Sequence, residues 1–131
     1  MTKIPEGAKG EFVLVVGPDH LANRFKDASL PPVLATPVMI MVMENAALNA
    51  LKPYLGPGES AVGTRVDVLH LAGAVQGQKV RGKAEVTKVD GRRIEFKVRA
   101  TSAGEELGIG THERMVIDLA KFAAKLKKKP A

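Results

Sequence analysis

The chain has 131 residues, of which 45% are hydrophobic and 26% charged, and it carries a formal net charge of +6. Such a composition is typical of one globular domain able to bury roughly two thirds of its unfolded surface. The chain contains no cysteine, which excludes disulfides, thiolate nucleophiles and cysteine-based zinc sites. No apolar run reaches the ~18 residues that cross a bilayer, and the first ten residues lack a signal-peptide core. We therefore expect a cytoplasmic protein with no membrane partner.

The charge and the histidines constrain the possible ligands. His20, His70 and His112 show no spacing typical of metal ligands, so we expect no metal and no other cofactor. Positive charge is concentrated in residues 91–100 and 121–130, which admits nucleic acid as a partner. Aromatic residues make up only 4% of the chain, without tryptophan, and this gives little support to base stacking. Because a solvated sheet face explains these charges sufficiently, nucleic acid is the least favoured partner.

The first elements are a strand, a long connection and a helix. Residues 11–16 form a short β-branched run that predicts a strand. Residues 17–35 are mixed in pattern, and connections of this length in a compact domain are often lids or binding loops. Thr36 and Pro37 then predict a helix start, with Thr36 as the N-cap, and Pro53 ends the helix near Lys52.

The helix is apolar on all sides over residues 38–43, so it must be covered on every side. Four strands follow in the pattern, at 60–73, 79–89, 92–102 and 106–119, with turns at 90–91 and 103–104. This order predicts an α+β hotdog fold, in which a curved antiparallel sheet of about five strands wraps one long central helix. One sheet covers only part of a helix, so we expect a homodimer or a dimer of dimers. Residues 1–131 are expected to form a single domain, with 123–131 as a frayed basic tail.

Two residues stand out as candidates for chemistry. Glu44 interrupts the apolar helix, and burial of an ionised carboxylate without a partner is costly. Periodicity alone leaves open whether Glu44 faces solvent at a subunit rim or works in a site. His70 shares one face of the strand at 60–73 with Val62, Thr64, Val66 and Val68. It is either a core or interface histidine or a general acid/base.

Other positions also have two interpretations. Gly63 interrupts a β-branched strand, where glycine marks a bulge or a close approach, and its N–H is a possible oxyanion donor. His112 and Arg114 share a strand face, with Glu113 opposite. A cation there would suit a phosphate or carboxylate ligand, although charged residues on a strand usually face solvent.

Several motifs together resemble the fluoroacetyl-CoA thioesterase family of hotdog hydrolases. They are "LATPVMIMVME", "YLGPGESAVGTRVDVLHLA", "VDGRRIEFKV" and "IGTHERMVID", and the similarity extends from about Val33 to Phe122. That family hydrolyses acyl-CoA thioesters without a metal, so the resemblance implies an acyl-CoA substrate, with CoA as part of the substrate. It implies catalytic roles for Thr36, Glu44 and His70, and substrate-binding roles for Gly63 and Arg114.

The chain also departs from the pattern of that family. The fluoroacetyl-specific member has aromatic gating residues before the helix, whereas residues 27–30 here offer only Asp27 and Leu30, with Phe25 as the nearest ring. We therefore expect hydrolysis of a short or medium acyl-CoA in general. The alternative is a non-catalytic acyl-CoA-binding or sensor module on the same fold.

The helix raises a geometric difficulty for the implied site. Eight residues of ideal helix separate Thr36 from Glu44 by ~12 Å along the axis. A distorted first turn, a later helix start, or residues that meet across a dimer would each resolve it.

Overall fold

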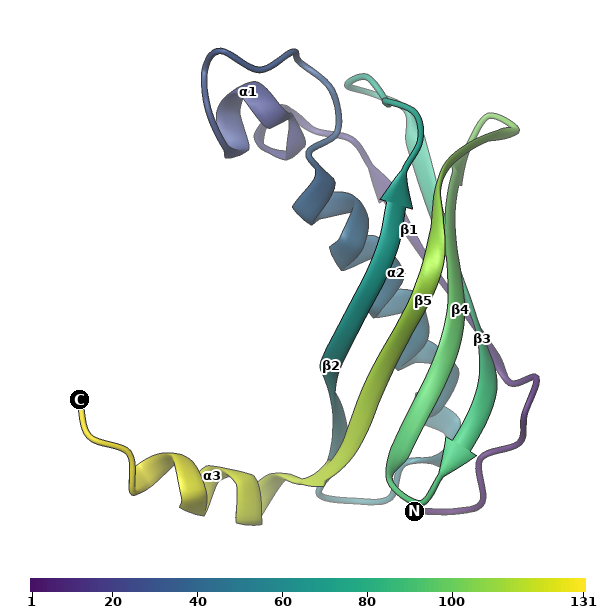
Figure 1. Cartoon of the computed structure of the whole chain (residues 1–131), viewed down its shortest axis with the longest axis vertical. Helices are drawn as coiled ribbons and strands as arrows, with labels where there is room; N and C mark the ends of the chain where they lie inside the picture. The colour runs from purple at the N-terminus through teal and green to yellow at the C-terminus, as the bar shows by residue number, and fades with distance from the viewer.

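A computed structural model describes all 131 residues. Its five strands form one antiparallel sheet in the spatial order β1-β3-β4-β5-β2. This sheet curls around helix α2 (Figure 1). The predicted arrangement of one central helix and five antiparallel strands is confirmed. The elements in chain order are β1 (Lys9–Val15), η1 (Pro18–His20), α1 (Ala22–Phe25), α2 (Thr36–Leu51), η2 (Lys52–Tyr54), β2 (Glu59–His70), β3 (Lys79–Asp90), β4 (Arg93–Ser102), β5 (Glu105–Asp118) and α3 (Leu119–Lys127).

Helix α2 begins one residue earlier than predicted. Its N-cap is Ala35, in extended conformation, and Thr36 is the first helical residue. The prediction that Thr36 is the N-cap is therefore wrong, and its hydroxyl is available for another partner. The α-helix ends at Leu51, and η2 continues it for one tighter turn that contains Pro53.

Helix α2 buries one broad face against the sheet and leaves the other face open. A Cβ on Gly82 of β3 would lie 2.6 Å from Val42 Cγ1 and 2.7 Å from the Val42 carbonyl oxygen, so only glycine permits this close approach. The buried face consists of Val38, Met39, Val42, Met43, Ala46, Ala47, Ala50 and Leu51. The opposite face follows a spacing of four residues and is only partly covered or exposed: Thr36, Ile40, Glu44 and Leu48. The single chain therefore covers the helix incompletely.

Strand β2 forms one edge of the sheet and contains an irregularity. It pairs with β5 alone, and the register shifts between Gly63 and Arg65. Such a shift transfers the following side chains to the other face. The predicted common face of 62, 64, 66, 68 and 70 is therefore wrong before the shift, where Ala61 is buried and Val62 is only partly so.

The central strands follow the predicted alternation closely. Buried side chains point toward α2 from β3 and β4: Val80, Ala84, Val86, Ile94, Phe96 and Val98. The turn between these strands has Gly91 at φ 62°, and the next turn has Ala103 at φ 50° and Gly104 at φ 80°. These left-handed residues lie at the two predicted turn positions.

The connection and the C-terminal segment both contain more structure than the pattern indicated. Residues 17–35 hold η1 and α1, and a bridge between Leu21 and Leu34 closes the base of this connection. Helix α3 continues to Lys127, whereas a frayed tail was expected from residue 123. The Asp118 side chain caps α3 by accepting a hydrogen bond from the Lys121 backbone N–H at 3.0 Å. Helix α3 extends away from the sheet on the β2 side (Figure 1).

No helix in the structure combines the length and the apolar character required to cross a lipid bilayer.

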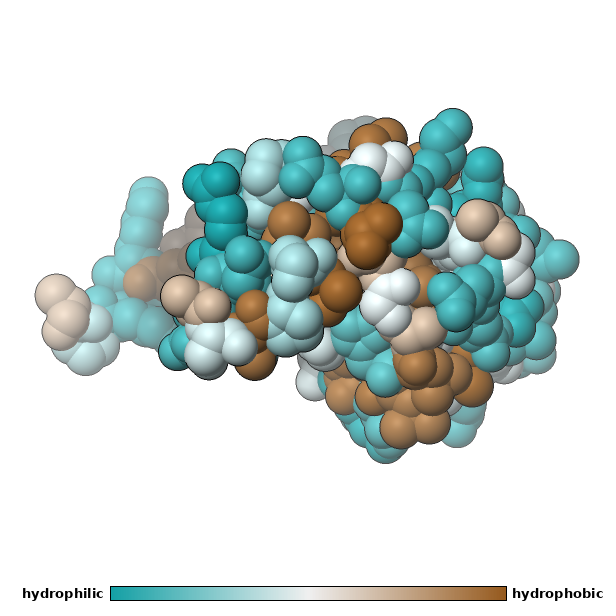
Figure 2. Space-filling model, turned by 90° about the horizontal axis from the view of Figure 1, so that it is seen from above, coloured by the Kyte–Doolittle hydropathy of each residue, from teal (hydrophilic) through white to brown (hydrophobic).

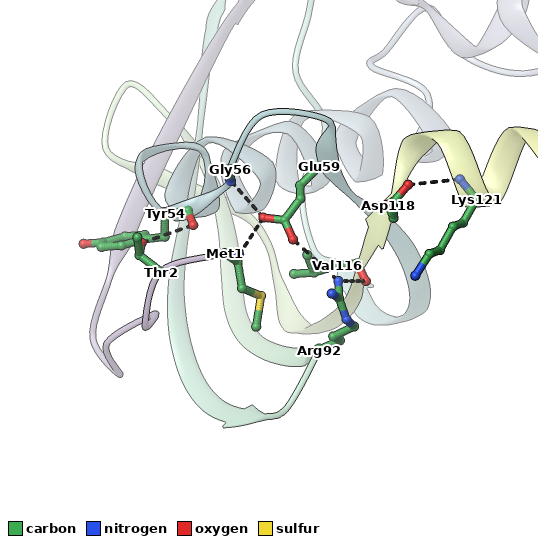
Figure 3. Close-up of polar contacts among 9 residues, drawn as sticks. All are labelled: Met1, Thr2, Tyr54, Gly56, Glu59, Arg92, Val116, Asp118 and Lys121. Atoms are coloured by element: carbon green, nitrogen blue, oxygen red, sulfur yellow. Dashed lines mark hydrogen bonds and ion pairs between the residues drawn. The ribbon is translucent and has the colours of Figure 1, made fainter.

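Glu59 ties together several segments at the end of the molecule near the N-terminus. Its Oε1 accepts a hydrogen bond from the Gly56 backbone N–H at 2.8 Å and lies 3.0 Å from the Met1 amino group. Its Oε2 lies 3.6 Å from Arg92 Nη1, and the same Arg92 nitrogen donates to the Val116 carbonyl at 3.4 Å (Figure 3). The Gly56 N–H, followed by the Met1 amino group, lowers the pKa of Glu59. The ionised carboxylate is therefore the form that the fold stabilises.

We predict that Glu59→Gln lowers the thermal midpoint of unfolding at pH 7, with little difference from wild type at strongly acidic pH. A carboxyl group whose folded-state pKa is lowered stabilises the fold above its unfolded-state pKa. This stabilisation disappears as the pH falls through the folded-state pKa. Thermal unfolding followed by circular dichroism at several pH values measures the difference. Glu6→Gln, an exposed carboxylate near the same end, is the control, and a deficit of Glu59→Gln that persists undiminished in acid would contradict the prediction.

Candidate active site

Thr36 and His70 meet where α2 begins and β2 ends. The Thr36 Oγ1 and His70 Nδ1 atoms are 2.8 Å apart, so a hydrogen bond joins them. The other ring nitrogen of His70, Nε2, is buried and has no hydrogen-bond partner. Buried polar atoms in proteins normally have a partner, and exceptions concentrate at functional positions. The hydrogen bond to Thr36 therefore orients the ring, and Nε2 is left without a partner in the structure.

Glu44 belongs to a second group of residues, at the middle of α2. Its Oε2 lies 4.0 Å from Arg114 Nη1, and its side chain is 36% exposed. A Cβ placed on Gly63 would lie 2.9 Å from this oxygen and 3.6 Å from Arg114 Nη1. Gly63 thus leaves the space that the carboxylate and the guanidinium share.

Arg114 is buried on the inner face of β5, which the sequence pattern did not favour. Its Nη2 donates to the Ala61 carbonyl at 2.6 Å, and its Nη1 lies 3.1 Å from His112 Nε2. Burial lowers the pKa of Arg114, whereas the Glu44 carboxylate raises it. Arginine stays charged in proteins, so the cluster presents a fixed positive charge beside Glu44.

The five expected residues form two separate groups in the structure. Thr36 and His70 form one group, and Glu44, Gly63 and Arg114 form the other. Helix α2 is regular from its first turn, since the Met39 N–H donates to the Ala35 carbonyl at 3.1 Å. A distorted first turn and a later helix start therefore cannot shorten the ~12 Å between Thr36 and Glu44 along the axis.

Two of the surface cavities are well defined, and one of them adjoins Thr36 and His70. A cavity of about 380 Å³ is lined from the connection, the start of α2 and the end of β2, by Ala22, Lys26, Leu30, Pro31, Val33, Leu34, Thr36, His70, Leu71, Ala72 and Gly73. A larger cavity of about 740 Å³ lies on the charged side of β1, β3, β4 and β5 and includes none of the candidate residues. Its charges pair with one another, as in Lys97 with Glu85 at 3.8 Å. The smaller cavity is the candidate substrate site.

No group of three or more histidine and carboxylate side chains is placed to hold a metal ion. The candidate residues are instead a hydroxyl, an imidazole, a carboxylate and a guanidinium. These groups suit proton transfer and the stabilisation of a developing oxyanion.

The sheet curled around one central helix, together with these polar groups, is typical of the hotdog class of thioesterases. The chain belongs to the fluoroacetyl-CoA-specific thioesterase family, whose model matches residues 16–120. It is 45% identical over 102 residues to the fluoroacetyl-CoA thioesterase of Streptantibioticus cattleyicolor, covering 78% of this chain and 73% of that protein.

Solved structures agree with this assignment. A crystal structure of the fluoroacetyl-CoA thioesterase superposes with a TM-score of 0.92 at 37% identity, covering 98% of this chain and 99% of that one. A mutant of that enzyme has been solved with fluoroacetate and CoA, with a TM-score of 0.84 at 38% identity over 90% of this chain and 98% of that one. A thioesterase superfamily member from Thermus thermophilus matches with a TM-score of 0.90 at 35% identity, covering 98% and 94%. The expected family and fold are confirmed.

Sequence reasoning did not select His112 as part of the site. The structure buries this ring between Arg114 and the β2 backbone, stacked on Phe96 with centroids 5.9 Å apart. The available signal was the alternation of β5, which places His112 and Arg114 on one face with Gly108 and Gly110. Small residues beside two basic ones indicate an inward face that accommodates large polar side chains.

We predict that Gly63→Ala folds but loses most of any Glu44-dependent activity. The added methyl group would meet Glu44 Oε2 at 2.9 Å, and the end of a flexible side chain moves away more readily than a backbone. A displacement of about 1 Å in a reacting group can cost about 100-fold in rate. The measurement is kcat/KM together with the thermal midpoint. Ser60→Ala on the same strand is the control, and full activity of Gly63→Ala would show that the position of Glu44 is unimportant.

Proposed function

We propose that the protein hydrolyses short or medium acyl-CoA thioesters to a free acid and CoA, in a site that two copies of the chain complete. The observation that carries this proposal is the pair of half-sites on the uncovered face of α2. One half-site holds His70 with a free Nε2, and the other holds Glu44 beside Arg114. Membership of a thioesterase family supplies the reaction class.

A second copy would unite the half-sites because of the position of β2. This edge strand lacks a partner on one side, and Val66 and Leu69 on it are 40% and 61% exposed. Antiparallel pairing of two β2 strands about a two-fold axis places the His70 end of one strand beside the Gly63 half of the other. Glu44 of one subunit then faces Thr36 and His70 of its partner. The same pairing would cover the open face of α2.

The chemistry assigns a separate role to each group. The Glu44 carboxylate attacks the thioester carbonyl or removes a proton from the attacking water. The Gly63 N–H stabilises the developing oxyanion, and the Arg114 charge lies beside it. The hydrogen bond between Thr36 Oγ1 and His70 Nδ1 orients the ring. The protonated ring delivers its Nε2 proton to the departing CoA sulfur and is left neutral, and the proton that the attacking water loses restores it. Acyl-CoA and water thereby yield the acid and CoA thiol, without a metal or other cofactor.

The smaller cavity indicates a general acyl specificity. Its lining contains aliphatic residues such as Leu30 and Leu71 and no phenylalanine, tyrosine or tryptophan, and it contains one lysine, Lys26. Figure 2 views the molecule from the end that carries the connection, where apolar atoms reach the surface between polar ones. An aliphatic lining suits a short or medium hydrocarbon chain, and Lys26 suits a phosphate of CoA. Nothing in this lining selects for fluorine.

The first prediction of this proposal is turnover of a panel of acyl-CoAs, followed by the release of free thiol. Glu44→Gln should lower kcat by about 10²–10⁴-fold, the usual contribution of a reacting carboxylate. It keeps the shape of the side chain, so its thermal midpoint should stay close to that of wild type. Asn45→Ala, next to Glu44 on the same helix, is the control. Saturable binding of the panel without any thiol release would favour a non-catalytic binding module.

The second prediction concerns the shared site. Glu44→Gln and His70→Ala should each be inactive alone, and mixing them with subunit exchange should restore about one quarter of wild-type activity. Half of the dimers would then be mixed, and each mixed dimer would carry one intact site. If both half-sites acted within one chain, the mixture would remain inactive. Sedimentation velocity on the same samples establishes that dimers form.

A further inference from the structure

His112 makes two hydrogen bonds that together determine its protonation. Its Nδ1 lies 2.7 Å from the Arg65 carbonyl oxygen, and its Nε2 lies 3.1 Å from Arg114 Nη1. A carbonyl only accepts and a guanidinium only donates. Nδ1 therefore carries the hydrogen, and Nε2 offers its lone pair to arginine. Only the neutral ring in this tautomer satisfies both partners.

This ring is one of the two acceptors that hold Arg114. The other is the Ala61 carbonyl, which accepts from Nη2 at 2.6 Å. With both acceptors in place, a planar guanidinium has a fixed orientation. Its Nη1 is then directed to the space beside Glu44 Oε2. His112 itself is held by Arg65 and by stacking on Phe96, so the support continues into β2 and β4.

We propose that neutral His112 is a positioning residue, which fixes Arg114 beside Glu44 and releases it when the ring gains a proton. The inference rests on the proposed function, because the position of Arg114 affects catalysis only if Glu44 takes part in the reaction. His112 touches no reacting atom in this scheme. Its effect on catalysis passes through the arginine.

Protonation would put an N–H on Nε2 that faces the N–H of Arg114, so two donors would meet without an acceptor. The charged groups around the ring are Arg114 and Glu113 from β5 and Glu44 from α2, while β2 contributes a carbonyl and β4 an apolar ring. Burial is the main influence and lowers the pKa of His112. The Arg65 carbonyl and the two carboxylates raise it, and Arg114 lowers it further. The state of His112 that holds Arg114 is therefore the neutral ring. This state is present above the pKa of His112 in the folded protein and is lost as the pH falls below it.

The first test is the nitrogen NMR spectrum of the histidine rings in wild-type protein, which does not depend on turnover. We expect His112 at neutral pH with hydrogen on Nδ1 and a bare Nε2. His20 is an internal control of the opposite kind, since its Nδ1 accepts from the Gly17 backbone N–H at 2.9 Å and its neutral ring must carry hydrogen on Nε2. A His112 ring with hydrogen on Nε2, or a doubly protonated one at neutral pH, would overturn the proposal.

The second test compares two substitutions by kcat, KM and the pH profile. His112→Leu fills the space without hydrogen bonds and should lower kcat by about ten- to a hundred-fold, with KM nearly unchanged. His112→Gln can donate to Arg65 and accept from Arg114, so it should restore kcat to within about three-fold of wild type. It should also flatten the acidic limb of the profile, because an amide does not titrate. Equal kcat in wild type and a folded His112→Leu would overturn the proposal, and so would equal losses in the two variants.

The two proposals fail in different ways. A wild type that releases no thiol from any acyl-CoA removes the proposed function, whereas the tautomer of His112 remains measurable. A wild type that turns over normally while His112 shows the other tautomer removes this inference alone.

Discussion

The geometric constraint that dominates this molecule is that one curled sheet cannot enclose a whole helix. The sheet covers the face of α2 that carries Val42, Ala46 and Ala50, and Gly82 allows the backbones to approach closely there. The opposite face carries Thr36, Ile40, Glu44 and Leu48 at the spacing of one helical row. A row that alternates polar and apolar residues suits neither water nor a plain core. The proposed dimer would close this face around a substrate.

The irregularity in β2 determines which of its residues face α2. Without a register shift between Gly63 and Arg65, the strand could not direct both Ala61 and His70 toward the helix side. Ala61 supplies the carbonyl that holds Arg114, and His70 supplies the free imidazole nitrogen. The missing side chain at Gly63 leaves room for the Glu44 carboxylate beside Arg114. The single register shift in β2 thus lets Ala61 and His70, which lie far apart along the strand, face the same side of the sheet.

The sequence was sufficient for most of the fold because periodicity reports burial directly. The alternation in β3 and β4, the left-handed turn residues and the apolar run of α2 each have one satisfactory structural solution. The site was harder to predict. Thr36 has the residue type of an N-cap, so its local pattern did not predict the hydrogen bond between its hydroxyl and His70. His112 and Arg114 look like outward charges, because their burial depends on Ala61 and Gly63 from a strand about 50 residues earlier. The sequence around Gly63 does not show which of the later β2 side chains move to the other face of the sheet after the register shift.

Glu44 lies near Arg114 but does not form a close bridge with it. A bidentate arginine bridge would occupy both oxygens and remove their lone pairs from any reaction. At 4.0 Å from Nη1, with its side chain 36% exposed, Glu44 feels the positive charge without close hydrogen bonding to it. The arginine must then be fixed by other acceptors, or it would close the gap and form the tighter pair. The Ala61 carbonyl and the His112 ring are those acceptors. In the proposed scheme the neutral His112 ring keeps the two charges apart, and its protonation is thereby linked to the reactivity assigned to Glu44.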